Sequence, residues 1–257
     1  MSELSGTHGL VIGVANKRSI AWAIAKAVSD AGARLAVTYQ GDRLEENVRE
    51  LAADLADPLI LPLDVGNDAQ IQDVANRCDE AFGGLDFVVH GAAFAPREEL
   101  TRPFVETSRE GFRLALDVSA FSLIAVARAT TPLLEKRGGG SILTLTYLGS
   151  ERVFPNYNVM GVAKAALEAS VRYLAADLGA KNIRVNAISA GPIKTLAASG
   201  IGGFSGILQV YRERSPMKRN TETSEVADTA RFLLGPGGRG ISGVVLIVDA
   251  GYHIMGL

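Results

Sequence analysis

The sequence has very little cysteine, tryptophan or histidine. Its 257 residues include one cysteine, one tryptophan and three histidines. A single cysteine cannot form a disulfide within the chain, so the composition fits a reducing compartment and we expect a cytoplasmic protein. The histidines, His8, His90 and His253, lack the spacing of zinc ligands, so we expect no metal site. Cys78 falls at helical spacing from Ile71 and is predicted to be a core residue rather than a nucleophile.

Excess charge and long apolar runs are also missing. There are 26 basic and 28 acidic residues, which give a net charge of −2. Nucleic-acid-binding proteins usually carry a strongly basic surface, so we expect no nucleic-acid partner. No apolar run approaches the roughly 20 residues of a membrane span, so we expect neither a membrane helix nor a signal peptide.

Glycine is abundant, with 28 residues, and apolar runs alternate with helical patterns. We predict strands at 9–14, 34–39, 59–65, 85–91, 141–147, 183–189 and 244–248, and helices at 20–28, 43–55, 69–82, 108–137, 158–178 and 224–234. The strand runs are continuously apolar, which indicates a parallel sheet covered on both faces. We therefore expect an α/β fold: one Rossmann-like domain over residues 1–257, with a doubly wound parallel sheet of about seven strands.

Residues at the first two strand ends suit a dinucleotide. Gly13 ends the first strand and a helix begins near Ser19 and Ile20, so backbone N–H groups at the helix N-terminus would face a pyrophosphate. The segment lacks the G-x-G-x-x-G fingerprint and also fits a tight turn with Ser19 as helix N-cap. Gln40 stands where such enzymes often carry a ribose-binding acid. A neutral amide there favours NADH, while Arg43 leaves NADPH open.

The third and fourth predicted strands end at the same rim. Asp64 and Val65 end the third strand, and Ala92 and Ala93 end the fourth. The adenine and the nicotinamide ribose would lie at this rim. Ordinary strand termination explains each of them equally well. Their coincidence with Gly13 favours a nucleotide site.

Tyr157 and Lys164 are the most informative pair. They stand seven residues apart. If both lie on one helix, seven steps of about 100° return to within about 20° of the start, so a phenol and an ammonium can flank one ligand. A fixed positive charge would make the tyrosine a better donor to an oxyanion than its ordinary pKa of about 10 implies. An isolated Tyr and Lys are more often surface residues, but this context favours catalysis.

Several segments carry the motifs of a known enzyme family. They are residues 13–20, 38–40, 94–96, 147–149, 155–161 and 187–200. In these segments the chain resembles the bacterial type II enoyl-acyl-carrier-protein reductases, a divergent family of short-chain dehydrogenases/reductases. The resemblance runs from about Leu4 to Gly251, and its specific part is tyrosine, six residues, lysine. The wider superfamily has tyrosine, three residues, lysine, but here Met160 stands four residues before Lys164.

The resemblance implies roles for individual residues. Tyr157 would be catalytic, Lys164 would fix the nicotinamide ribose, Tyr147 would line the thioester in place of the superfamily's serine, and Ala95 would lie near the substrate. The implied cofactor positions are Gly13, Ser19, Ile20, Gln40, Asp64, Val65, Ala92, Lys164, Ile193, Lys194, Thr195, Leu196 and Ala197.

The resemblance also implies a reaction and partners. NADH would reduce the trans-2 double bond of an enoyl thioester in the last step of the fatty acid elongation cycle, through an enolate held by Tyr157. The substrate would be carried by an acyl carrier protein, and the enzyme would be a homotetramer. Residues 195–214 would form a lid over the acyl chain, loosened by glycine, although a plain surface loop fits as well.

Two departures from the family matter. Ala92 and Ala93 replace a bulkier Ile-Gly pair, so inhibitor sensitivity does not follow from the resemblance. The start of the lid lacks the basic residues that relatives tend to carry, and Arg212, Arg214 and neighbouring cations are the alternative docking patch for an acidic carrier.

Two other functions remain open. One is a carbonyl reductase of the same superfamily that acts on 3-oxoacyl substrates, against which Met160 and Tyr147 argue. The other is an inert nucleotide-binding regulator, which the intact Tyr157 and Lys164 make unattractive.

Overall fold

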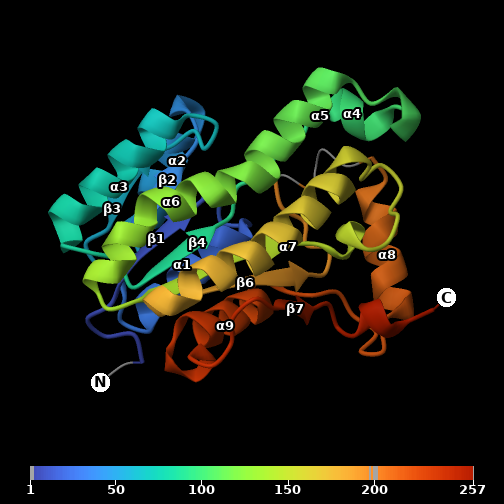
Figure 1. Ribbon diagram of the computed structural model, residues 1–257. Coiled ribbons are helices and arrows are strands. Elements are labelled where there is room, and N and C mark those ends of the chain that lie inside the picture. The colour runs from blue at the N-terminus through green and yellow to red at the C-terminus, as the bar shows by residue number, and fades with distance from the viewer. Residues whose placement is uncertain (1–2, 197, 199–201, 257) are drawn as a thin grey trace.

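A seven-stranded sheet forms the centre of the computed structural model (Figure 1). The structure describes residues 3–196, 198 and 202–256. The strands are β1 (His8–Ile12), β2 (Arg34–Tyr39), β3 (Leu59–Pro62), β4 (Phe87–His90), β5 (Gly140–Thr146), β6 (Ile183–Ala190) and β7 (Val245–Val248). Each strand pairs in parallel with its neighbours, in the order β3-β2-β1-β4-β5-β6-β7. The predicted Rossmann-like sheet is confirmed.

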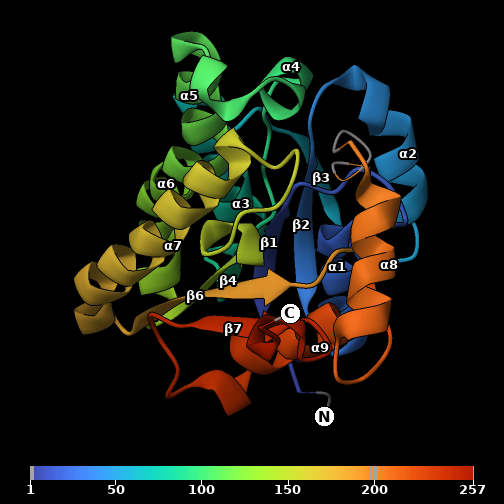
Figure 2. The same cartoon turned by 90° about the vertical axis from the view of Figure 1, so that its right-hand side faces the viewer.

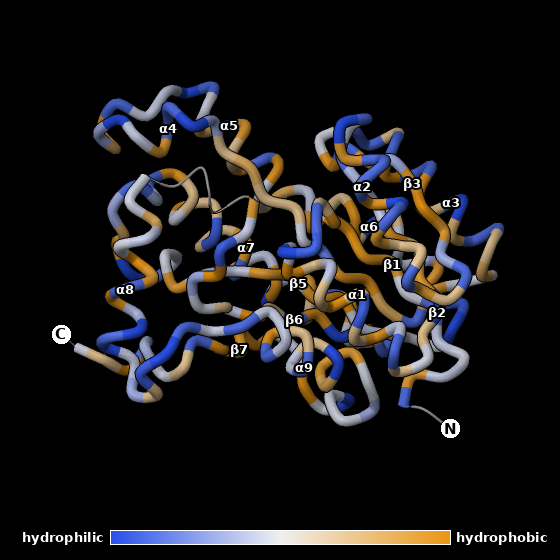
Figure 3. The backbone as a smooth tube through the Cα atoms, turned by 180° about the vertical axis from the view of Figure 1, so that it is seen from behind, coloured by the Kyte–Doolittle hydropathy of each residue, from blue (hydrophilic) through white to orange (hydrophobic). Residues whose placement is uncertain are grey.

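Helices cover both faces of the sheet, as Figure 2 shows. One face carries α1 (Ile20–Asp30), α2 (Asp42–Ala52) and α9 (Thr223–Leu234), and the other carries α3 (Asp68–Phe82), α6 (Ser122–Lys136) and α7 (Val159–Leu178). Strand β1 explains the two cores. Val11 packs into the cluster of α1 and α9, whereas Leu10 and Ile12 pack into that of α3 and α6. Because side chains alternate along a strand, a wholly apolar run supplies both faces, and the central strands are mostly hydrophobic in Figure 3.

The strand order reverses beside β1, which lies between β2 and β4. In such sheets a crevice opens at the carboxyl ends of the two strands at the reversal. The register pairs Ile12 with His90, so the residues that follow, Gly13 and Gly91, lie close together. A Cβ on Gly13 would stand 2.6 Å from the Gly91 carbonyl oxygen, and Gly13 has a φ of +93°. Only glycine fits here, and the crevice begins at this position.

The predicted elements are confirmed in number and order for the strands, with ends that differ by a few residues. The single helix expected at 108–137 is instead α5 (Arg109–Leu116), the π-helical turn η2 (Asp117–Phe121) and α6. Two helices had no counterpart in the sequence-based prediction: α4 (Arg97–Thr101) and α8 (Phe204–Arg214). α4 is too short to show a period, and Gly206 interrupts the pattern of α8.

The continuous run Arg109–Lys136 has 28 residues and is long and apolar enough to cross a membrane by length and composition alone. In this fold 61% of its most apolar window is buried inside the protein, as in a core helix. Cys78 is completely buried as predicted, and burial raises the pKa of its thiol to about 12, which leaves it protonated and unreactive.

Candidate active site

Two adjoining cavities open at the carboxyl ends of the strands. The first, of about 300 Å³, lies in the crevice between β1 and β4 and is called the rim cavity. The second, of about 430 Å³, contains Tyr147, Tyr157 and Lys164 and is called the tyrosine cavity. Ile20, Ala93, Leu145 and Thr195 line both. An elongated ligand in the rim cavity would therefore reach the tyrosines at one end.

The loop from β1 to α1 leaves the N-terminus of the helix available to a ligand. Ser19 stands at the N-cap position, but its side chain does not cap the helix. Its hydroxyl accepts instead from the N–H groups of Ala15 (3.2 Å) and Asn16 (3.0 Å). The hydroxyl thus ties the loop together, and the first N–H groups of α1 meet the cavity that Ser19 and Ile20 line. Such a terminus suits a pyrophosphate, so the residues present fit a dinucleotide.

Most of the residues predicted to bind the cofactor lie around these cavities. Those that line the rim cavity are Gly13, Ser19, Ile20, Gln40, Val65, Ala92, Thr195 and Leu196. Lys164 and Ile193 line the tyrosine cavity. Asp64 and Lys194 line neither and are exposed, with Asp64 accepting from the Gly66 N–H, and Ala197 lies outside the described residues.

The tyrosine cavity is apolar over most of its wall. Its described lining holds two cationic side chains, the exposed Arg97 and the buried Lys164. Ala95, predicted to lie near the substrate, lines it, together with Leu100 and Met160. An acyl chain suits such a wall, and the polar side chains of Tyr147, Tyr157 and Lys164 line the same cavity.

Tyr157 does not lie on the same helix as Lys164. The condition that both residues lie on one helix, from which we inferred that their side chains share a helical face, is therefore wrong. α7 begins at Val159, and Tyr157 sits in the preceding turn between two residues with positive φ, Asn156 (φ 61°) and Asn158 (φ 40°). Asparagine tolerates this conformation better than most residues. The turn still brings Tyr157 and Lys164 to one cavity wall.

The expected electrostatic effect on Tyr157 is also reversed. Its ring is 8% exposed. Burial, then the nearby Tyr147 and Glu168, raise the pKa of Tyr157 well above its usual range. A phenolate is disfavoured where little water can solvate it. Tyr157 therefore keeps its proton and acts as a hydrogen-bond donor.

Lys164 is buried on α7 and held by the end of strand β5. Its Nζ donates to the Leu145 carbonyl oxygen over 2.8 Å. Burial lowers the pKa of Lys164 to about 8, and the negative charge of Glu168 partly opposes that shift. Two further N–H groups on Nζ remain to bind ligand hydroxyls.

Tyr147 stands among aromatic rings. Its ring centroid lies 5.1 Å from that of Tyr157, nearly edge-on, and 4.9 Å from that of Phe154. Two glycines allow this packing: a Cβ on Gly149 would be 2.4 Å from the Tyr157 ring, and one on Gly161 would be 2.7 Å from the Gly149 carbonyl oxygen. Small residues at these positions therefore set how closely the tyrosines approach α7.

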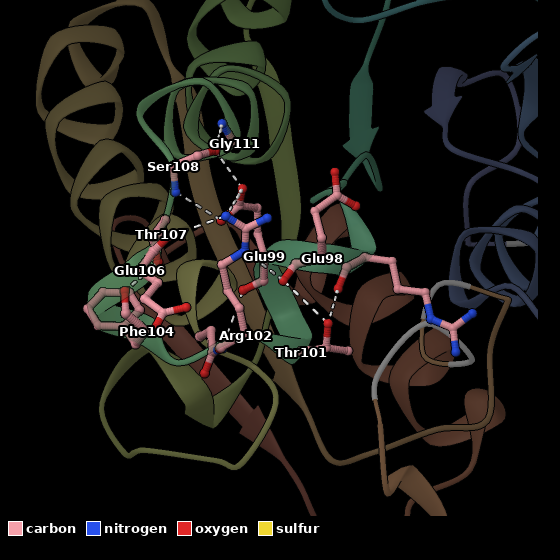
Figure 4. A network of polar contacts seen from close by, with 11 residues as sticks. Glu98, Glu99, Thr101, Arg102, Phe104, Glu106, Thr107, Ser108 and Gly111 are labelled. Atoms are coloured by element: carbon pink, nitrogen blue, oxygen red, sulfur yellow. Dashed lines mark hydrogen bonds and ion pairs between the residues drawn. The ribbon is translucent and has the colours of Figure 1, made fainter.

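A network around Glu99 holds the cavity wall formed by α4, as Figure 4 shows. The buried Glu99 carboxylate accepts from the Ser108 hydroxyl (2.5 Å) and the Ser108 N–H (3.1 Å), and Arg102 lies 3.7 Å away. The Asn158 side-chain amide donates to the carbonyls of Glu99, Leu100 and Arg102. The turn that carries Tyr157 is thereby joined to the opposite wall.

The π-helical turn η2 contacts two residues that line the tyrosine cavity, Phe94 and Met160. Ser119 accepts from the Phe94 N–H (2.9 Å), and its hydroxyl lies within hydrogen-bond distance of the Phe94 carbonyl (3.0 Å) and 3.7 Å from the Met160 sulfur. Such turns are common at functional sites because they redirect side chains.

Sequence reasoning missed Glu168, Asn158 and Tyr211. Glu168 follows Lys164 by one helical turn, a spacing that could have indicated a charge partner. Nothing in the sequence pattern places Tyr211, from α8, against Tyr147.

The parallel sheet, the open helix N-terminus and the Tyr157–Lys164 wall define a class, that of the short-chain dehydrogenases/reductases. Residues 13–253 match the family model described as Enoyl-(Acyl carrier protein) reductase. The chain belongs to the enoyl-(acyl-carrier-protein) reductase family.

Individual relatives agree. The chain is 54% identical over 254 residues to the enoyl-(acyl-carrier-protein) reductase (NADH) FabI of Bacillus subtilis, with 98% of each chain covered. It is 51% identical to that of Nostoc sp., with 100% of each covered. The Bacillus cereus reductase in complex with NADP+ and indole naphthyridinone superposes with a TM-score of 0.97 at 54% identity, covering 100% of both chains. The Anaplasma phagocytophilum reductase in complex with NAD gives 0.95 at 46% identity, covering 100% of this chain and 97% of that one.

Proposed function

We propose that the protein reduces the trans-2 double bond of enoyl thioesters carried by an acyl carrier protein, with NADH, in the last step of fatty acid elongation. The observation that most supports this proposal is that the rim and tyrosine cavities share wall residues, while Tyr147, Tyr157 and Lys164 line the tyrosine cavity. The relatives named above as NADH-dependent enoyl reductases support the same activity.

The residues of the chain divide the work. Bound NADH supplies the hydride that adds to the β-carbon of the enoyl thioester, and solvent supplies the proton that ends on the α-carbon. The Tyr157 hydroxyl donates to the thioester oxygen, where negative charge develops. Because burial keeps its pKa high, Tyr157 stabilises this oxygen by hydrogen bonding and retains its proton. Lys164 holds the nicotinamide ribose, and Tyr147 lines the thioester.

NADH is the proposed cofactor rather than NADPH. Among the described residues, no lysine or arginine lines the rim cavity, and Arg43 lies outside its lining. Gln40 lines it instead, and its neutral amide suits a ribose hydroxyl better than a phosphate. Asp64, Lys194 and Ala197 are also proposed to contact the cofactor. An NADPH affinity equal to or tighter than the NADH affinity would contradict this preference.

Residues 195–214 are proposed to act as a lid on a single catalytic domain of residues 1–257. The described part includes Phe204 and Ile207, which line the tyrosine cavity, and the Asn156 amide donates to the Gly202 carbonyl over 2.8 Å. A lid would be protected from proteolysis by cofactor with a substrate analogue. Unchanged cleavage would contradict it.

We also propose that the chain is of the divergent type II class and that it docks an acyl carrier protein. The chain would be a divergent type II enzyme, in which Met160 lines the tyrosine cavity at the position four before Lys164. Arg212 and Arg214, near the end of α8, would dock the acidic carrier, whereas Arg219 is already paired with Glu225. Carrier-bound turnover should then weaken with added salt, and salt-independent turnover would contradict this patch.

A cytoplasmic homotetramer is proposed. Three exposed aromatic rings, those of Phe112, Phe121 and Tyr173, support subunit contacts at the surface where they lie. Light scattering should give four times the 27.1 kDa of one chain, and a monomer would contradict it.

The function is tested by mixing the protein with NADH and a crotonyl thioester, and separately with an acetoacetyl thioester, while following NADH absorbance. Oxidation with the crotonyl substrate alone is expected. Oxidation with the acetoacetyl substrate alone would make the protein a carbonyl reductase, and tight NADH binding without oxidation of either would make it a regulator.

A further inference from the structure

Glu168 is a buried carboxylate that the proposed reaction does not use. It lies on α7 one turn after Lys164 and is 7% exposed. Charged carboxylates are rarely buried unless a partner compensates them. Its Oε1 accepts a 2.6 Å hydrogen bond from the Thr146 hydroxyl, and Thr146 is itself 5% exposed. The pair therefore forms a built, water-poor contact between α7 and the end of β5.

Thr146 stands between two residues of the active site. Leu145 offers the carbonyl that accepts from Lys164, and Tyr147 lines the tyrosine cavity. α7 is thus joined to consecutive residues of β5 by two hydrogen bonds, from Lys164 to Leu145 and from Thr146 to Glu168. Each of the two ionisable side chains is thus held by a hydrogen bond with β5, and their spacing of four residues places them on the same side of α7.

We propose that Glu168 is a positioning residue, which through its hydrogen bond from Thr146 and its charge keeps Lys164 an ammonium aimed at the nicotinamide ribose. Lys164 is 6% exposed, and burial favours its neutral form, which the negative charge of Glu168 one turn away on the same helix opposes. This inference rests on the proposed NADH-dependent function.

Other titratable groups near Lys164 do not change charge in the same pH range. His90 on β4 is buried, and its pKa is lowered to about 3, so it stays neutral. The pKa values of Tyr147 and Tyr157 are raised by burial, so both stay protonated. Arg184 on β6 donates instead to the carbonyls of Leu233 and Gly238. Lys164, with a pKa of about 8, is the group whose charge an NADH titration would follow.

The test measures NADH affinity by fluorescence over a pH series in the full-length protein and in Glu168→Gln. The amide keeps the shape and can still accept from Thr146, but it lacks the charge. Losing a nearby opposite charge lowers the pKa of a lysine. NADH affinity should then fall about fivefold at about pH 8 and recover to within about twofold of the parent at about pH 6.5.

Matched variants separate positioning from structure. Asp177→Asn removes an exposed carboxylate from the same helix and should leave the profile unchanged. Thr146→Val removes the hydroxyl and should shift the profile in the direction of Glu168→Gln, while Thr146→Ser should restore it. A loss of affinity that is equal at every pH, or an unshifted profile in Glu168→Gln, overturns the inference.

The outcome is separable from the proposed function. If the parent protein binds no NADH and reduces no enoyl thioester, the function itself fails. If the parent binds NADH and reduces the enoyl thioester, but the NADH-affinity profile of Glu168→Gln over pH is the same as that of the parent, only the proposed role of Glu168 fails.

Discussion

The hydroxyl of Tyr211 donates a 3.3 Å hydrogen bond to the hydroxyl of Tyr147, although the two residues are 64 positions apart. Tyr211 comes from α8, is 1% exposed, and stacks on Tyr252 with ring centroids 3.7 Å apart. The hydrogen bond thus couples α8 to Tyr147 in the wall of the tyrosine cavity.

Replacing Tyr211 by phenylalanine should lower kcat about fivefold with NADH affinity unchanged, because the ring stack on Tyr252 remains while one hydrogen bond is lost. Steady-state kinetics with a crotonyl thioester would measure it. Tyr252→Phe is the control, since it keeps the stacked ring. In a Tyr147→Phe background the Tyr211 substitution should have no further effect; additive losses would show that Tyr211 does not act through Tyr147.

Tyr157 and Lys164 should separate turnover from cofactor binding. Tyr157→Phe removes the donor to the developing oxyanion and should lower kcat by about 100-fold, with under threefold loss of NADH affinity. Lys164→Ala removes the ribose donor and should weaken NADH binding by about tenfold or more. Turnover kinetics combined with NADH titration distinguish the two. Unchanged NADH affinity in Lys164→Ala would refute this division of roles.

Gly149→Ala should displace the ring of Tyr157, the residue proposed to be catalytic. The added Cβ would stand 2.4 Å from Tyr157 and 3.1 Å from Tyr147, so the rings must move. Small misplacements of a catalytic group are costly, and we expect kcat to fall about tenfold at unchanged NADH affinity. Ser150→Ala, in the next position, lies outside the tyrosine cavity and serves as control. Equal kcat values for the two variants would show that the space at Gly149 is unimportant.

His90 should make the fold sensitive to acid. Its buried ring lies between the hydroxyls of Thr144 (3.0 Å) and Ser122 (2.8 Å), and burial, with a smaller effect of Lys164, lowers its pKa to about 3. Between that value and the unfolded pKa of about 6.5, the unfolded chain binds more protons. Stability is therefore full above about pH 6.5 and is lost as pH falls towards about 3, by up to about 1.4 kcal/mol per pH unit.

Urea unfolding at several pH values would measure this slope. In His90→Gln, which cannot titrate, the free energy of unfolding should depend less steeply on pH below about 6.5. Parallel curves for the parent and the variant would show that His90 contributes nothing to acid sensitivity.

The local sequence pattern was sufficient to predict the helices and strands in which buried residues recur at a regular spacing. Strand β2 has the predicted bounds, and α3 begins one residue before its predicted start, since Asn67 caps it by accepting from the N–H groups of Ala69 and Gln70. The same approach missed α8, whose helix contains Gly206 and is held by tertiary contacts such as that of Tyr211. Local propensity carries no information on contacts between distant segments.

The sequence by itself determined the class of fold and predicted which residues meet at the crevice. Continuous apolar runs required a sheet buried on both faces, Gly13 predicted the crevice, and Tyr157 and Lys164 were predicted to flank one ligand. Only the tertiary structure decided their electrostatics. Burial keeps Tyr157 protonated and lowers the pKa of Lys164, and packing brings Thr146 of β5 against Glu168 and Tyr211 of α8 against Tyr147. A pKa reflects all surrounding charges and the exclusion of water, and both exist only once distant segments have come together.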